Sequence, residues 1–347
     1  MDDLTLPPES ASAPPPEADS IPADAATFLA GAGWAGAEIA PLAGDASFRR
    51  YFRVSGARGK AMLMDAPPPH EDPRPFLRAA RWLDENAMRA PRILAEDAER
   101  GFVLLEDFGE VRMREYLDAW PDDETAIYKA AVDALVALHR LPPGPFTSYA
   151  LAEYLREAKL FTEWYCPAQG LEVDSAGYAA AWEEALSPLL ARQRPGVTVL
   201  RDYHAENIML LGGLADQGLL DFQDALVGHP AYDLVSLLQD ARRDVSEGLE
   251  ARMIAYYLER TGLSADDFTA DYARLGAQRN AKIVGIFVRL WRRDGKARYL
   301  SLIPRVWQAL ERDLAHPALA PVAAWFDANV PAHLRDPAGI LGGEFGA

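Results

Sequence analysis

The sequence has almost no cysteine, comparatively few basic residues and no long uncharged apolar run. Cys166 is the only cysteine among 347 residues, which excludes an intramolecular disulfide and a cysteine-based zinc site. The 35 Lys and Arg residues stand against 52 Asp and Glu residues, so the formal net charge is −17. Because a field of that sign repels polyanions, we expect neither nucleic acid nor a membrane surface as a partner.

Targeting and membrane signals are also missing. No stretch approaches the roughly 18 uncharged apolar residues of a membrane span, and the start, Met1-Asp2-Asp3, lacks the basic and apolar segments of a signal peptide. We therefore expect a cytoplasmic protein. Apolar residues still make up 50% of the chain, and this share with this length favours a two-lobed enzyme with a large interior, which we expect to be a monomer.

Composition and periodicity divide the chain into three parts. Residues 1–22, rich in Pro, Ala, Ser and acidic side chains, predict a disordered tail. We expect a small β-rich N-terminal lobe over residues 23–109 and a larger, mainly helical C-terminal lobe over residues 110–347, an α+β arrangement. Apolar periodicity predicts helices at residues 25–32, 76–88, 126–139, 151–165 and 178–192, strands at 51–54, 61–64, 102–105, 197–200, 208–211 and 218–220, and further helices up to about residue 329.

The most informative segment is Leu-Arg-Asp-Tyr-His-Ala-Glu-Asn-Ile-Met at residues 200–209. It places Asp202 and Asn207 five residues apart in a loop between apolar strands, and Asp221 follows within Leu-Leu-Asp-Phe-Gln-Asp. Phosphoryl transfer needs a carboxylate that orients and deprotonates the attacking hydroxyl, and oxygen ligands for magnesium. Each residue alone would be an ordinary loop-former. Their joint spacing favours Asp202 as the base, with Asn207 and Asp221 as metal ligands.

These motifs resemble those of the aminoglycoside phosphotransferase and choline kinase family, over about residues 25–330. The runs at residues 219–225 and 229–240, Leu-Leu-Asp-Phe-Gln-Asp-Ala and His-Pro-Ala-Tyr-Asp-Leu-Val-Ser-Leu-Leu-Gln-Asp, look most like those of the cell-wall sugar kinases. The resemblance implies a two-lobed, protein-kinase-like fold that uses ATP and Mg²⁺. It also implies phosphorylation of the anomeric hydroxyl of N-acetylmuramate or N-acetylglucosamine, giving the sugar 1-phosphate for peptidoglycan recycling.

The resemblance also assigns roles to three further positions. Asp233 would brace the catalytic loop, Glu106 would lie at the adenine hinge, and Ser47, in the glycine turn at residues 44–48, would meet phosphate. The chain departs from the family pattern twice. Leu200 stands where the family often has His, and Met64 stands where it often has a phosphate-pairing Lys. Our candidates to replace that lysine are Arg49, Arg50 and Lys60.

Substrate contacts are predicted on weaker grounds. His204 and Glu206 flank the catalytic loop, although solvent-facing loop polarity explains them equally well. Asp224 follows the metal carboxylate, but it would also suit a helix cap. Arg279 and Asn280 precede an apolar helical run and would reach the sugar from a C-terminal helix, unless they lie on its surface.

Three other functions stay open at this point. An aminoglycoside or choline-type kinase would need a wall of carboxylates, whereas an acidic sugar would need an arginine, for which Arg279 is the candidate. A metallohydrolase would use a two-metal site. A catalytically weak nucleotide-binding module would explain Met64 and Leu200. The ligands of the hydrolase would be Asp202, His204, Asp221, Asp224 and His229.

Overall fold

The computed structural model describes residues 20–42 and 49–335, and they divide into two compact units. The first unit runs to residue 77 and includes residues 92–107, and the second comprises residues 78–91 and everything from residue 108 onward. Helix α2 (Arg74–Glu85) therefore begins in the first unit and ends in the second. The glycine turn at residues 44–48 and most of the predicted tail lie outside the described residues. The lobe boundaries at residues 23–109 and 110–347 stay a prediction.

The first unit is an antiparallel five-stranded sheet with the order β1-β2-β3-β5-β4. Alternate side chains of its central strands, among them Phe52, Leu63 and Leu104, pack with Phe28 of α1 into a buried core. Two strands, β1 and β4, escaped the sequence analysis because they are edge strands without a buried residue, so neither shows a clear apolar alternation. The elements are α1 (Ala25–Gly31), β1 (Glu38–Pro41), β2 (Arg50–Gly56), β3 (Gly59–Asp65), β4 (Ile93–Asp97) and β5 (Phe102–Glu106).

Met64 lies at an apolar position of this sheet. It pairs with Tyr51 and Val103 and is fully buried, on the face opposite Leu63. Two of the predicted lysine replacements are engaged in ion pairs, Arg49 with a carboxylate at 3.5 Å and Arg50 with another through its Nε at 3.0 Å. Their role towards phosphate stays a prediction.

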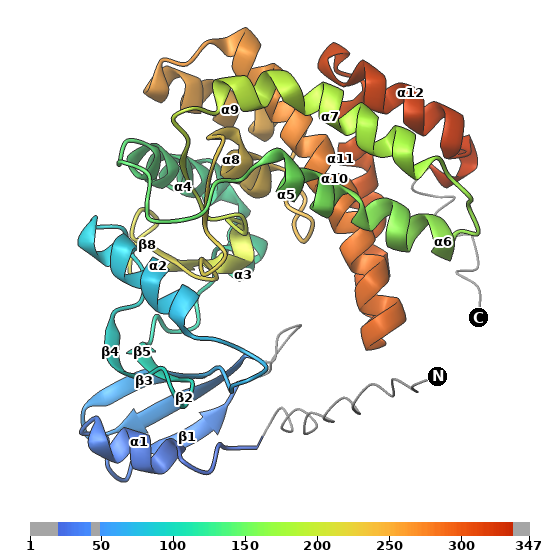
Figure 1. Cartoon of the computed structure of the whole chain (residues 1–347). Helices are drawn as coiled ribbons and strands as arrows, with labels where there is room; N and C mark the ends of the chain where they lie inside the picture. The colour runs from blue at the N-terminus through green and yellow to red at the C-terminus, as the bar shows by residue number, and fades with distance from the viewer. Residues whose placement is uncertain (1–19, 43–48, 336–347) are drawn as a thin grey trace, which may run out of the picture. The chain divides into compact units, whose positions relative to one another are not determined.

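The second unit is mainly helical, and the 30-residue helix α10 runs through it (Figure 1). Helices α7 and α12 pack side by side, and α11 lies against α10. None of the helices in the described ranges is long and apolar enough to cross a membrane. The helices are α3 (Met113–Ala119), α4 (Glu124–His139), α5 (Leu151–Ala158), α6 (Cys166–Ala168), α7 (Ser175–Arg192), α8 (Ala231–Leu238), α9 (Glu247–Thr261), α10 (Ala265–Asp294), α11 (Ile303–Leu314) and α12 (Ala320–Asn329).

The helix expected at residues 151–165 is interrupted. After α5 the chain forms one π-helical turn, η2 (Phe161–Tyr165), which packs against α10. At this contact, a Cβ on Gly285 would lie 2.3 Å from the carbonyl group of Leu160. Only glycine permits two backbones to approach this closely. The contact lies where the helical pitch changes.

Candidate active site

Two short antiparallel strand pairs bring the predicted catalytic residues together. Strand β6 (Val197–Val199) pairs with β9 (Leu226–Gly228), and β7 (Ile208–Leu210) pairs with β8 (Gln217–Leu219). The loop between β6 and β7 carries Asp202 and ends in the 3₁₀ turn η3 (Ala205–Asn207), while Asp221 follows β8. Asn207 Nδ2 donates to the Asp202 carbonyl at 3.0 Å and lies 3.4 Å from Asp221 Oδ2. All three residues therefore converge, as the spacing predicted.

Asp233 of α8 holds the backbone that precedes Asp202. Its carboxyl accepts hydrogen bonds from the backbone N–H groups of Leu200, at 2.6 Å, and Arg201, at 2.8 Å, and it is fully buried. Burial raises the pKa of Asp233 to about 7, and the nearby Asp202 charge adds to the rise. Arg201 and Asp221 both have left-handed backbones, with φ of 73° and 58°. Such non-glycine residues cost on the order of 1–2 kcal/mol each, so the loop needs this support.

A buried ion cluster next to Asp202 escaped the sequence analysis. Glu157 of α5 lies 3.0 Å from Lys282 Nζ of α10, and it also pairs with Arg201 and accepts a hydrogen bond from the Tyr149 hydroxyl. Burial raises the pKa of Asp202, but the neighbouring cations, Lys282 first among them, outweigh burial and hold this pKa below its ordinary value. The Asp202 carboxyl is therefore ionised at neutral pH.

His204 and Glu206 are tied into the loop's own network. His204 is 4% exposed, its Nε2 lies 3.3 Å from Arg242 Nη1, and its Nδ1 has no partner among the described residues. Burial lowers the pKa of His204, so the imidazole is neutral at pH 7. Glu206 accepts from Arg242 Nε at 2.9 Å and pairs with Arg114. A role of either side chain in sugar binding stays a prediction.

The remaining predicted sugar contacts lie in different surroundings. Arg279 is close enough to Asp202 to lower its pKa, and its Nη2 donates to Ser236 Oγ at 2.8 Å, while Nη1 has no partner in the described part of the chain. Asn280 is fully buried and donates to the side chain of Gln239 at 2.7 Å, a geometry that favours a structural role. Asp224 is exposed at the end of the loop.

The donor set suits magnesium better than a hydrolytic metal pair. Asn207 and Asp221 lie side by side, with the Asn207 amide nitrogen 3.4 Å from Asp221 Oδ2, and Gln223 Nε2 donates to Asp221 Oδ1 at 2.8 Å. A hard cation that keeps water and phosphate oxygens as further ligands needs no more from the protein. Across residues 20–42 and 49–335, no three His, Cys, Asp or Glu side chains gather into a metal site. His229, which the hydrolase would need, instead lies 3.2 Å from Asp271.

The predicted nucleotide contacts belong to the first unit. The Glu106 carboxylate accepts from Arg92 Nε at 3.1 Å, and the Glu106 backbone N–H donates to the Arg92 carbonyl at 2.9 Å. Ser47 lies outside the described residues. Both roles stay predictions.

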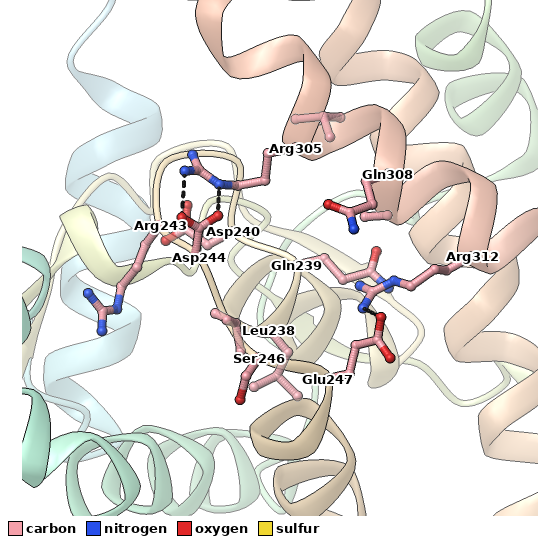
Figure 2. A pocket seen from close by; sticks show the side chains of 13 residues that line it. Leu238, Gln239, Asp240, Arg243, Asp244, Ser246, Glu247, Arg305, Gln308 and Arg312 are labelled. Carbon is pink, nitrogen blue, oxygen red and sulfur yellow. Dashed lines mark hydrogen bonds and ion pairs between the residues drawn. The ribbon is translucent and has the colours of Figure 1, made fainter. Parts of the chain in front are cut away.

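A cavity of about 220 Å³ lies in the second unit, between the loop after α8 and helix α11 (Figure 2). Its wall is made of opposite charges: Arg305 Nη2 lies 3.0 Å from Asp244, and Arg312 Nη1 lies 3.3 Å from Glu247. Asp240, another lining residue, accepts the Ala205 backbone N–H at 3.2 Å and so connects the wall to the catalytic loop. No predicted sugar contact lines this cavity.

The chain is similar in sequence to a known family and to proteins with assigned names. Residues 38–277 match the model of a family described as the phosphotransferase enzyme family. An N-acetylmuramate/N-acetylglucosamine kinase of Caulobacter vibrioides is 36% identical, over 89% of this chain and 97% of that protein. A kinase of the same name from Pseudomonas aeruginosa is 40% identical, over 82% of this chain and 86% of that protein.

A solved structure, of a choline/ethanolamine kinase family protein from Mesorhizobium loti, covers 87% of this chain and 97% of its own, with a TM-score of 0.62 and 17% identity. At that identity the likeness concerns the fold alone. The expected fold class, α+β and kinase-like with a β-rich N-terminal part, is confirmed.

Proposed function

Because this chain belongs to the phosphotransferase enzyme family, we propose that it transfers the γ-phosphoryl group of ATP to the anomeric hydroxyl of N-acetylmuramate or N-acetylglucosamine. The product is the sugar 1-phosphate. The observation that carries this proposal is the convergence of Asp202, Asn207 and Asp221 around the β7–β8 hairpin and the loop that precedes it. The choice of sugar rests on the names of relatives that are 36% and 40% identical.

In the proposed reaction, the Asp202 carboxylate accepts a hydrogen bond from the sugar hydroxyl and orients its oxygen towards the γ-phosphorus. The new oxygen–phosphorus bond forms as the bond to the β-phosphate oxygen breaks, ADP leaves, and the hydroxyl proton passes to Asp202. The ionised state of Asp202 suits this role, because the carboxylate accepts the proton at neutral pH.

Asn207 and Asp221 would hold magnesium through their side-chain oxygens. Bound magnesium supplies positive charge that offsets the charge on the phosphate oxygens. Asp233 fixes the backbone at Arg201 and thus the position of the base. Glu106 and Ser47 stay our candidates for adenine and phosphate contacts. His204, Glu206, Asp224, Arg279 and Asn280 stay the candidates for sugar contacts. A cytoplasmic monomer stays our expectation.

The decisive experiment is product analysis by ³¹P and ¹³C NMR with the free sugar and with its 1-O-methyl glycoside. We expect magnesium-dependent phosphorylation of the free sugar and none of the glycoside, because the methyl group removes the attacking oxygen and leaves every other hydroxyl available. Phosphorylation of both compounds would show that another hydroxyl reacts. Reaction of kanamycin or choline in place of either sugar would favour the aminoglycoside or choline-type kinase. Nucleotide binding without any acceptor would favour the catalytically weak module.

A further inference from the structure

The hydroxyl group of Ser236, in the middle of α8, bonds to the catalytic loop. A serine within a helix commonly donates to a backbone carbonyl one turn back along the same helix. The Ser236 hydroxyl instead donates to the backbone carbonyl of Arg201 at 3.2 Å, and the serine is fully buried. That carbonyl belongs to the peptide group that joins Arg201 to Asp202. The hydrogen bond therefore holds the backbone directly before the proposed base.

Helix α8 holds residue 201 from both sides. Asp233 accepts the Arg201 backbone N–H at 2.8 Å, and Ser236, three residues further along the helix, bonds to the Arg201 carbonyl. Residues three apart in a helix lie on the same face, so both side chains reach the loop together. Arg201 has a left-handed backbone, with φ of 73°, which a non-glycine residue keeps only where its surroundings fix it. The bond to Asp233 alone would leave the ψ torsion of residue 201 free, and the bond to Ser236 fixes this torsion.

Arg279 of α10 determines where the Ser236 hydroxyl points. Its Nη2 donates to Ser236 Oγ at 2.8 Å. A guanidinium has no acceptor and a hydroxyl has a single proton, so the Ser236 proton must turn away from Arg279. The Arg201 carbonyl is the acceptor that receives it. A hydroxyl that accepts from a cation is also a stronger donor. We call this chain of two hydrogen bonds, from Arg279 through Ser236 to the Arg201 carbonyl, the positioning relay.

The backbone after Asp202 is held by the loop itself. Asn207 Nδ2 donates to the Asp202 carbonyl at 3.0 Å, and the His204 backbone N–H donates to the same carbonyl at 3.1 Å. Both donors lie within five residues of Asp202. The peptide groups on the two sides of Asp202 are thus fixed in different ways. The downstream side depends on local contacts, and the upstream side depends on α8 and α10.

We propose that Ser236, oriented by Arg279, is a positioning residue that aims the Asp202 side chain by fixing the ψ torsion of residue 201. The inference rests on the proposed function and deepens it, because the aim of Asp202 matters only if its carboxylate acts on the acceptor hydroxyl. It also gives Arg279, which is 4% exposed, a role that needs no contact with the sugar. The relay acts on the rate of phosphoryl transfer and leaves the binding of ATP and sugar unchanged.

The test measures steady-state kinetics of Ser236→Ala and Arg279→Met, singly and together, with ATP and N-acetylglucosamine varied. In Ser236→Ala, kcat should fall about tenfold, the rate equivalent of one hydrogen bond, while both KM values stay within about twofold. Arg279→Met should lower kcat to a similar extent in wild type. In the Ser236→Ala background it should lower kcat only about threefold or less, because the relay is already broken.

Two further variants separate the relay from general effects of the substitution. Ser301→Ala is the matched control, since it removes an exposed hydroxyl that also donates to a backbone carbonyl, at 2.8 Å, and its kcat should equal that of wild type. Ser236→Thr keeps the hydroxyl and should retain most of the wild-type kcat. Circular dichroism melting gives the folded fraction of every variant at the assay temperature.

Several results would overturn the relay. Losses of kcat that multiply in the double variant would show that Arg279 and Ser236 act separately. A raised KM for the sugar in Arg279→Met, with kcat unchanged, would make Arg279 a sugar contact instead. A kcat that falls only in proportion to the folded fraction would make Ser236 a structural residue. If wild type phosphorylates neither sugar, the proposed function itself fails. If wild type is active and Ser236→Ala keeps its full kcat, only the relay fails.

Discussion

Replacing Asp233 by asparagine tests the brace of the catalytic loop. In wild type both carboxyl oxygens accept backbone N–H groups, from Leu200 at 2.6 Å and Arg201 at 2.8 Å. An asparagine offers one acceptor oxygen, so its own NH₂ group would face one of these N–H donors. Leaving a buried N–H unpaired costs about 1–3 kcal/mol. We therefore expect Asp233→Asn to displace the loop and to lower kcat about 10²-fold, the usual effect of misplacing a catalytic group by 1 Å.

The free energy of unfolding should depend on pH differently in wild type and in Asp233→Asn. The pKa of Asp233 is about 7 in the folded protein and 3.8 as its ordinary value. The group therefore stabilises the fold fully below pH 3.8, and this contribution is lost as pH rises through 7, a total of about 4 kcal/mol. Roughly 3 kcal/mol of that loss falls between pH 5 and pH 8. Asparagine does not titrate, so the variant lacks this loss.

Urea unfolding followed by circular dichroism at pH 5 and pH 8 measures the difference. Asp233→Asn should be less stable than wild type at pH 5, and the gap should shrink by about 3 kcal/mol at pH 8, while kcat stays low at both values. Asp267→Asn, which removes a carboxylate whose side chain is 60% exposed, is the control for the change in charge. The reasoning is refuted if the gap is the same at both pH values, or if activity recovers together with stability.

Three further changes test the proposed chemistry. Asp202→Asn should fold normally and bind ATP, but kcat should fall about 10²–10⁴-fold, and a loss under threefold in a steady-state assay would exclude Asp202 as the base. Asn207→Ala and Asp221→Ala should both raise the magnesium concentration needed for half-maximal rate, Asp221→Ala more because it also removes a charge; superimposable magnesium titrations would contradict the ligand assignment. Glu157→Gln should lower kcat more than it changes either KM, because Arg201 loses its anchor, and partial rescue by Glu157→Asp would separate this effect from misfolding.

The sequence predicted those parts of the site that lie close together along the chain. Asp202, Asn207 and Asp221 fall within 20 residues, and a hairpin of two short apolar strands is enough to place them side by side. Helices α4 and α7 were equally predictable, because each has an apolar stripe at the helical period, whereas α9, α10 and α11 were expected only as further helices without bounds. Strands β1 and β4 were missed because both are edge strands without a buried residue.

The sequence did not predict the contacts between segments that are distant along the chain. Nothing near Glu157 or Lys282 marks them as neighbours of the base, since α5 and α10 each show an ordinary helical pattern and meet only in the folded chain. The contacts of Asn280 could not be predicted either. Its position on a helix predicts the face on which it lies, but only tertiary packing brings its amide to Gln239. Long-range contacts of this kind leave no periodic trace in a single sequence.

The close contact between Gly285 and the Leu160 carbonyl has a consequence for variation among relatives of this chain. Leu160 follows directly on α5, so the contact helps to set the spacing between α5 and α10, which carry Glu157 and Lys282 respectively. Any side chain at residue 285 must push the helices apart, yet it touches no group that takes part in the chemistry. A substitution there would therefore disturb the Glu157–Lys282 ion pair and, through it, the charges around Asp202. Divergence among relatives can thus begin at a position with no functional group at all.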